Sequence, residues 1–261
     1  MENKYYSKVV IGTWSLSGDL GKISKKNVYE TIEVALKNNF FEFDTAPTYG
    51  LGKMELILGE ITSGEKKIKI NTKCGYNSEN IKTFLINDIK RSIDKSLKSL
   101  GKINTLFLHN PRNEIKSWTN IIKFLNDYKK NNHIKNIGIS LARNYYFSED
   151  ILNSFDYIQD EINLLRPNSL EKLKNCKSKI MARSPLASGC LSEKLSLKSK
   201  FLQNDYRNSW LGKKKRLKNI LFQIEQIKKI TGNNLRQFSK NFLLQQKVIN
   251  KVIFGVKSSS H

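Results

Sequence analysis

Short apolar runs alternate along the chain with longer amphipathic stretches. Eight runs are rich in the β-branched and aromatic residues that strands prefer: residues 9–12, 40–44, 68–73, 105–109, 137–140, 157–159, 180–182 and 252–255. Four stretches between them repeat apolar positions at the period of a helix: residues 25–38, 81–100, 117–130 and 214–230. The pattern predicts strands and helices in alternation.

Local residues indicate how two of these helices begin, end and face the core. Ser24 is the expected N-cap of residues 25–38, and Gly101 is the expected C-terminal stop of residues 81–100. The apolar face of the first helix holds Val28, Ile32, Ala35 and Leu36. The apolar face of the second holds Leu85, Ile89, Ile93, Leu97 and Leu100.

The alternation indicates the fold class. Strands that alternate with helices are typical of a parallel sheet with helices outside it. Eight strands in one unit favour a closed barrel over an open sheet. The chain has no G-x-G-x-x-G fingerprint, which removes the main evidence for a Rossmann fold. We therefore predict an α/β fold, a (β/α)8 TIM-type barrel, built by residues 1–261 as one domain.

The charge of the chain is strongly positive, with 46 Lys and Arg against 23 Asp and Glu and a formal net charge of +23. A charge of this size is typical of nucleic-acid-binding proteins. However, 38 of the 46 are lysines, they are scattered, and 28 asparagines accompany them, as A/T-rich coding would produce. Readers of bases use arginine for bidentate contacts. We therefore expect no nucleic-acid partner, which salt-sensitive binding to DNA or RNA would contradict.

The numbers of cysteines and histidines limit which cellular compartment and which metal sites are plausible. The three cysteines are far apart, which argues against a disulfide framework, and three histidines (His109, His133 and His261) leave little for a metal site. No apolar run reaches the ~18 residues of a membrane helix, and the N-terminus has no signal-peptide pattern. We expect a cytoplasmic protein without a metal or a membrane partner.

Titratable residues close three successive strand runs: Asp44, Lys73 and His109. The C-terminal strand ends of a barrel meet at the face that carries its chemistry, so we expect these side chains to lie together. Tyr49 follows Asp44 by five residues. A lysine ammonium beside a tyrosine favours the phenolate and lowers its pKa. Together the four groups are suited to protonate a carbonyl oxygen while hydride arrives at the carbon.

Six segments, distributed along nearly the whole chain, carry a recognisable pattern. The most diagnostic is FDTAPTYG at residues 43–50, followed by Glu55 and by Leu58 with Gly59. The others are NTKCG at 71–75, SLKSLG at 96–101, LFLHNP at 106–111, ARSPLASG at 182–189 and FGVKS at 254–258. Taken in this order, they resemble the aldo-keto reductase family.

The resemblance implies the catalytic roles. Tyr49 would be the general acid, Lys73 would tune it, Asp44 would pair with Lys73, and His109 would orient the substrate carbonyl. It also implies a nicotinamide cofactor, NADP(H) in preference to NAD(H). The implied cofactor contacts are Thr13, Trp14, Asp44, Ser140, Gln159, Arg183, Ser184, Pro185, Leu186, Ser188, Gly189, Lys257 and Ser258.

Different residues of this set would contact different parts of the implied cofactor. Ser140 and Gln159 would hold the nicotinamide carboxamide, and Arg183 stands where many relatives carry an aromatic that stacks on the nicotinamide. The backbone of residues 184–189 would approach the pyrophosphate. Lys257 and Ser258 would contact the 2′-phosphate, which is the reason for favouring NADP(H). Trp14 would also line the substrate pocket.

Two departures from the family pattern stand out. Leu141 occupies a position where the family often has Asn, and the chain ends four residues after Lys257, before the last outer helix of the relatives. We therefore expect a C-terminally shortened member whose barrel lacks its last outer helix, with an uncovered flank open to self-association.

The favoured function is NAD(P)H-dependent reduction of a small aldehyde or ketone to an alcohol, with Tyr49 as general acid. The alternative is a catalytically weak or inactive barrel of the same family, acting as a nucleotide-sensing or partner-binding subunit. The complete set of four catalytic residues favours the first, and the shortened C-terminus favours the second.

Overall fold

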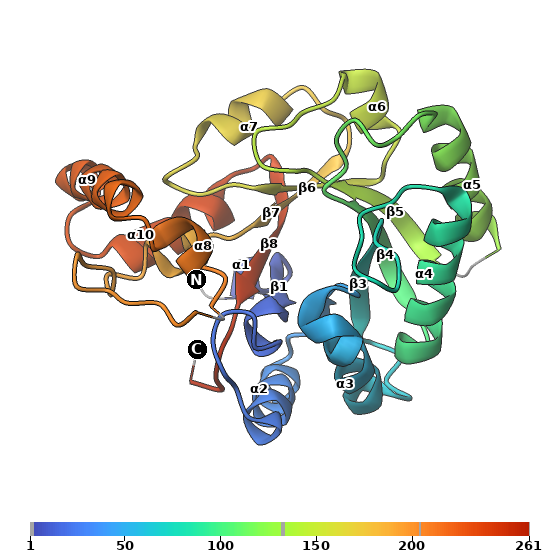
Figure 1. The fold of residues 1–261 in the computed structure, drawn as a ribbon, viewed down its shortest axis with the longest axis horizontal. Coiled ribbons are helices and arrows are strands. Elements are labelled where there is room, and N and C mark those ends of the chain that lie inside the picture. The colour runs from blue at the N-terminus through green and yellow to red at the C-terminus, as the bar shows by residue number, and fades with distance from the viewer. Residues whose placement is uncertain (1–2, 132–133, 204, 261) are drawn as a thin grey trace.

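The computed structural model describes residues 3–131, 134–203 and 205–260, so His133 and His261 lie outside the described residues. Eight parallel strands form a closed barrel in chain order, with β8 pairing back onto β1 (Figure 1). The strands are β1 (Val9–Gly12), β2 (Glu42–Asp44), β3 (Lys69–Cys74), β4 (Ile103–His109), β5 (Ile134–Ser140), β6 (Tyr157–Glu161), β7 (Lys179–Arg183) and β8 (Ile249–Gly255). The predicted barrel is confirmed.

Helices surround this barrel. They are α1 (Asn3–Tyr6), α2 (Lys25–Lys37), α3 (Lys53–Thr62), α4 (Ile86–Leu100), α5 (Trp118–Lys130), α6 (Glu149–Asn153), α7 (Asn168–Leu173), α8 (Asn208–Leu211), α9 (Lys214–Thr231) and α10 (Leu235–Gln245). The predicted cap of α2 is confirmed, because the Ser24 side chain accepts a hydrogen bond from the Asn27 backbone N–H.

The start of α4 differs from the prediction. Before the helix, residues 76–85 fold back in a short antiparallel bridge between Tyr76 and Lys82. The Thr83 side chain then donates to Asp88 at the beginning of the helix. The helix therefore begins only at Ile86, and Leu85, expected on the buried face, is 67% exposed. The remainder of that face is inward as predicted, with Ile89 and Ile93 buried.

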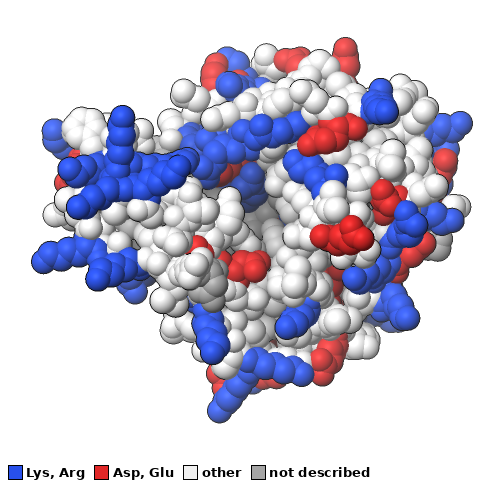
Figure 2. All heavy atoms as spheres, in the orientation of Figure 1, with Lys and Arg blue, Asp and Glu red and all other residues white. Residues whose placement is uncertain are grey.

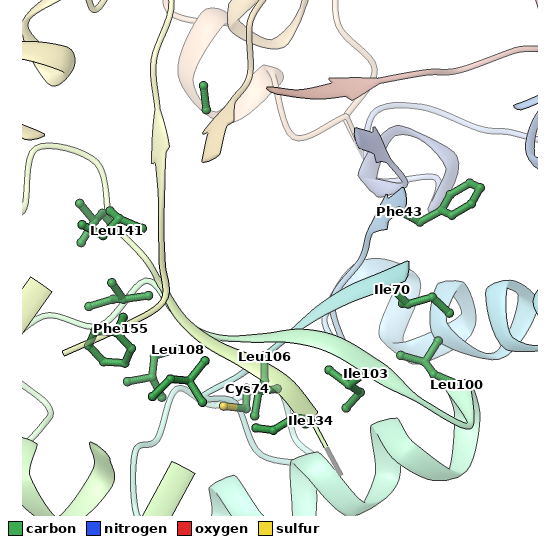
Figure 3. Close-up of a cluster of buried hydrophobic side chains, with 14 of the residues drawn as sticks. Phe43, Ile70, Cys74, Leu100, Ile103, Leu106, Leu108, Ile134, Leu141 and Phe155 are labelled. Carbon is green, nitrogen blue, oxygen red and sulfur yellow. The ribbon is translucent and has the colours of Figure 1, made fainter. Parts of the chain in front are cut away.

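The main hydrophobic core lies between the strands and the outer helices (Figure 3). Ile70 on β3 and Leu106 on β4 point outward into this layer, to which α4 contributes Leu100. A smaller apolar cluster fills the middle of the barrel, formed by Val10, Phe107, Met181 and Ile253. Its fit depends on Gly138, because a Cβ there would lie 2.5 Å from the Phe107 ring.

Polar side chains occupy the barrel interior on both sides of this apolar cluster. Toward the N-terminal strand ends, Glu42 accepts from Asn71 (3.0 Å) and pairs with Lys251 (2.6 Å). Toward the C-terminal ends, Asp44 and Lys73 lie two residues further along the same two strands, β2 and β3. We call these sets the lower polar layer (Glu42, Asn71 and Lys251) and the upper polar layer (Asp44, Lys73 and Gln159).

The seam between β8 and β1 differs from the rest of the barrel wall. Within the residues that the structure describes, no helix follows β8. A cleft of about 2070 Å³ opens over the C-terminal strand ends and continues down this seam. There it is lined by Val34 of α2, Leu244 of α10 and Phe254 of β8. The seam is therefore an open groove on the flank of the barrel.

Candidate active site

The four side chains expected to carry catalysis come together at the C-terminal strand ends. Asp44 ends β2, His109 ends β4, Lys73 lies on β3, and Tyr49 follows β2 in a short 3-10 turn. All four line the large cleft, whose mouth is the hollow in the middle of the face in Figure 2. The shared lining brings the predicted set into one site.

Lys73 and Asp44 form a buried ion pair. The Lys73 ammonium lies 2.7 Å from Asp44 Oδ1 and also donates to the Thr45 carbonyl at 2.8 Å. Lys73 is only 1% exposed. Burial by itself lowers the pKa of a lysine, but Asp44 and Tyr49 outweigh it and hold the pKa of Lys73 above its ordinary value. The lysine is therefore a fixed positive charge.

Tyr49 stands against this charge. The Lys73 ammonium lies 4.9 Å from the centre of its ring, and the rings of Trp14 and His109 flank it at 6.3 and 6.5 Å. Burial raises the pKa of Tyr49, and Lys73 opposes this while Asp44 adds to it, with a net rise. Lys73 thus acts in the predicted direction, but burial prevails in this structure. The phenol is protonated at neutral pH.

His109 is held as a neutral ring. Burial lowers its pKa well below the ordinary value of 6.5, and the positive charges of Lys73, Arg183 and Lys82 lower it further. Its Nδ1 is buried and has no hydrogen-bond partner in the part of the chain that the structure describes. The Tyr76 ring packs edge-on against the imidazole, with the ring centres 5.3 Å apart. A neutral imidazole retains one N–H that can donate to a substrate oxygen.

Ser140 and Gln159, expected to hold the carboxamide, form hydrogen bonds with each other and with Asp44 of the ion pair. Ser140 Oγ donates to Gln159 Oε1 at 2.8 Å, and Gln159 Nε2 donates to Asp44 Oδ2 at 2.8 Å. Thr13 differs from the other predicted contacts, since it is wholly buried and does not line the cleft. Its hydroxyl donates to the Asp44 carbonyl at 3.0 Å instead.

Arg183 belongs to a group of charges that the sequence did not reveal. Its guanidinium donates to the Leu141 carbonyl at 3.1 Å and lies 3.8 Å from Glu161, which Arg143 also binds through two hydrogen bonds. Burial raises the pKa of Glu161, but Arg183 and Arg143 outweigh it and keep the pKa below its usual value. Glu161 therefore remains charged and anchors both arginines at the cleft.

The segment after β7 turns sharply at the cleft. Positive φ angles occur at Ser184, Ala187, Ser188 and Gly189. The cleft is lined by all five predicted contacts of this segment: Ser184, Pro185, Leu186, Ser188 and Gly189. Arg207 also lines it, beside Gly189, and is held by Asp205 at 2.6 Å. Arg207 was not predicted, because an isolated arginine in a basic segment gives no signal.

A bridge crosses the cleft between the β7 segment and the loop after β1. The Tyr206 backbone N–H donates to the Asp19 carbonyl at 2.9 Å, and the Tyr206 ring packs against Trp14 at 5.1 Å. Lys257 donates to the Leu20 carbonyl at 2.6 Å beside this bridge. Lys257 and Ser258 both line the cleft, as predicted.

Basic side chains gather on one side of the cleft mouth, over α8 and the start of α9 (Figure 2). The lining on this side includes Lys194, Arg207 and Arg216. In the described ranges, no group of three or more His, Cys, Asp or Glu has the arrangement of a metal site. Nor does any helix of this part of the chain have the length and apolar character needed to cross a membrane.

Comparison with known proteins identifies the family of the chain. The model of the Aldo/keto reductase family matches residues 8–261. Aldo-keto reductase YhdN of Bacillus subtilis (strain 168) is 25% identical over 277 residues, which cover 96% of this chain and 81% of that protein.

Two solved structures share the fold. The glycerol dehydrogenase AKR11B4 of Gluconobacter oxydans superposes with a TM-score of 0.77 at 22% identity, over 97% of this chain and 83% of that one. The aldo-keto reductase AKR11C1 of Bacillus halodurans, in its holo form, has a TM-score of 0.74 at 19% identity and the same coverage. With a family match over nearly its whole length, the chain belongs to the aldo/keto reductase family of oxidoreductases.

Proposed function

We propose that this protein reduces a small aldehyde or ketone to an alcohol with a nicotinamide nucleotide, NADP(H) in preference to NAD(H). The observation that carries the proposal is the protonated phenol of Tyr49 in the cleft, packed against the buried Lys73–Asp44 pair and beside the neutral His109. A proton donor, a cation to stabilise the phenolate, and a neutral hydrogen-bond donor are what carbonyl reduction requires.

In the proposed reaction the bound nucleotide supplies hydride to the carbonyl carbon. Tyr49 gives its phenolic proton to the carbonyl oxygen, so that the carbonyl becomes an alcohol and Tyr49 becomes a phenolate. Lys73 stabilises that phenolate at close range, and Asp44 keeps Lys73 in place. His109 donates an N–H to the carbonyl oxygen and orients it. A proton from solvent then restores the phenol.

The residues of the cleft fit a dinucleotide. Among the described residues, buried polar atoms of His109, Asn110 and Trp210 have no hydrogen-bond partner, and all three residues line the cleft. The left-handed turn at residues 187–189 brings backbone close to the cleft beside Arg207, an arrangement that suits phosphate. Lys257 and Ser258 lie at the far end, where a 2′-phosphate would gain from a cation, which supports NADP(H).

The walls near Tyr49 indicate a small substrate with an apolar face. Trp14 packs against the phenol and Tyr76 against the imidazole, and Tyr206 extends this aromatic surface by packing against Trp14. Aromatic side chains of this kind exclude water and pack against flat or aliphatic groups. They support a small carbonyl compound as the substrate class.

The test begins with titration of the purified protein with NADPH and with NADH, followed by tryptophan fluorescence, since Trp14 and Trp210 line the cleft. We expect saturable quenching, tighter for NADPH, and oxidation of NADPH when aldehydes and ketones are added. Correctly folded protein that binds neither nucleotide would contradict the proposal.

A second candidate function is a nucleotide-sensing or partner-binding barrel without turnover. The open groove at the β8–β1 seam favours it, because a groove between α2 and α10 that is lined by partly buried apolar side chains such as Val9 and Phe254 suits association with another chain. The same titration separates the two functions. Saturable nucleotide binding with no oxidation of NADPH by any carbonyl compound would favour this candidate.

A further inference from the structure

Gln159 joins two parts of the site that have separate roles in the proposed function. It receives a hydrogen bond from Ser140 on one side and donates to Asp44 on the other, both at 2.8 Å. Asp44 in turn holds Lys73, which packs against Tyr49. The result is one chain of contacts, from the pocket at Ser140 to the phenol, in which Gln159 is 0% exposed.

The orientation of this amide is determined by its neighbours. An ionised carboxylate only accepts hydrogen bonds, so the Gln159 group that faces Asp44 must be the NH₂. The amide oxygen then faces Ser140, whose hydroxyl donates to it. Met181 Sδ lies 3.7 Å from the same Nε2 and closes the site on the barrel side. Gln159 therefore presents a fixed N–H to the second oxygen of Asp44.

We propose that Gln159 is a positioning residue of the proton-transfer group, and that its N–H on Asp44 controls how tightly Tyr49 holds its proton. This inference rests on the proposed role of Tyr49 as general acid. It assigns Gln159 a task on Asp44, separate from any contact with the nucleotide. Gln159 touches Asp44 directly and acts on Tyr49 only through Asp44 and Lys73.

The physical argument follows from the opposite charges beside Tyr49. Lys73 favours the phenolate, whereas Asp44 disfavours it. An N–H donated to Asp44 disperses part of the negative charge of that carboxylate, so Lys73 is less neutralised. Removal of the N–H leaves a buried carboxylate oxygen without a donor and strengthens the effect of Asp44. Tyr49 should then hold its proton more tightly.

The lower polar layer offers a matched control within the same barrel. There one carboxylate oxygen of Glu42 pairs with the Lys251 ammonium, and the other accepts a hydrogen bond from the Asn71 amide. The upper layer has the same construction, with Asp44 between Lys73 and the Gln159 amide. Asn71→Leu and Gln159→Met each remove one amide donor from a buried carboxylate. The second carboxylate pairs with a lysine that lies against a tyrosine, Lys73 against Tyr49.

The experiment follows the titration of Tyr49 itself in protein that contains neither nucleotide nor substrate. The tyrosines are replaced by 3,5-difluorotyrosine, whose lower pKa brings the titration into an accessible range, and the Tyr49 signal in the ¹⁹F NMR spectrum is assigned by its loss in Tyr49→Phe. We expect Gln159→Met to move the midpoint upward by about one unit, or to abolish titration below about pH 10. Asn71→Leu should leave it within about 0.2 units of the wild-type value.

An unchanged midpoint in Gln159→Met, or an equal shift in Asn71→Leu, would overturn the inference. Ser140→Ala sharpens the test, because it releases the amide without removing it and should give a smaller shift in the same direction. The titration does not depend on turnover. A shift in a protein that reduces no carbonyl compound would therefore reject the proposed function alone, and normal reduction without a shift would reject this inference alone.

Discussion

The lower and upper polar layers of the barrel have the same internal construction and different surroundings. Each places a buried carboxylate of β2 between a lysine and an amide that other strands of the barrel supply. The lower layer ends in a contact between Lys251 and the Ser7 carbonyl. The upper layer opens into the cleft and carries Tyr49 and His109 beside it. A buried carboxylate–lysine pair by itself therefore has a structural role. The proposed chemistry depends on its neighbours, Tyr49 from the loop after β2 and His109 from the end of β4.

Removal of the proton donor should have the largest effect on the upper layer and its neighbours. We expect Tyr49→Phe to lower the rate of carbonyl reduction by about 10²–10⁴-fold, the usual contribution of a general acid. Quenching of tryptophan fluorescence by NADPH should persist, because the phenolic oxygen is removed without loss of the ring. Tyr76→Phe, which alters the neighbouring aromatic of His109, is the control. Retention of most activity in Tyr49→Phe would remove the acid assignment.

Exchange of the two lysines for methionine tests the comparison more directly. Lys73→Met should lower kcat by about a hundredfold and also destabilise the protein, since it leaves Asp44 buried without its cation, a loss of about 3–5 kcal/mol. Lys251→Met should keep kcat within about twofold and lower the free energy of unfolding by about 1–3 kcal/mol. The measurements are steady-state kinetics and urea unfolding followed by circular dichroism. A fall in kcat of similar size in both variants would mean that the layers are coupled through barrel geometry.

The upper layer was the part of the site that the sequence predicted best. Asp44, Lys73 and His109 are conspicuous because each closes an apolar run, and in a parallel barrel such ends converge. Tyr49 follows from its short distance to Asp44 along the chain. The lower layer gave no such signal, since Glu42 and Lys251 lie within or beside strand runs and meet only through the closure of the barrel.

The charges around Arg183 were missed for a related reason. The run predicted at residues 157–159 ended where acidic residues begin, whereas β6 continues to Glu161. In a sequence, consecutive charged residues indicate an exposed loop, because the side chains that would pair with them inside the fold cannot be identified. Here Arg143 and Tyr146, from the connection between β5 and β6, bind Glu161 and Asp160 and allow the strand to continue into the barrel wall. Such partners follow from the three-dimensional fold and not from any local pattern.

Helix α3 was also absent from the prediction. In α3, the apolar residues Met54, Leu58 and Ile61 are interspersed with Ile57 and Leu56, so the stretch lacks a clear polar face. Its burial instead depends on close contact with α4, where a Cβ on Gly59 would lie 1.8 Å from the Ser99 carbonyl oxygen. The error at Leu85 has the opposite cause. There the apolar residues keep the period of a helix through a segment that precedes α4 and contains the antiparallel bridge.

The smallest expected effect concerns His109, which lies beside the upper layer and whose imidazole has an ordinary pKa of 6.5. Its pKa in the folded protein lies well below 6.5, so between the two values the unfolded chain binds a proton that the folded chain does not. Stability must then fall as the pH falls below about 6.5, by up to about 2 kcal/mol between pH 7 and pH 5. Urea unfolding at several pH values measures this loss. His109→Gln should remove that part of the pH dependence, whereas a neutral substitution in the lower layer, Asn71→Leu, should leave its slope unchanged. An identical slope in wild type and His109→Gln would mean that the imidazole takes up its proton in the folded state, which would exclude the neutral donor on which the proposed orientation of the carbonyl depends.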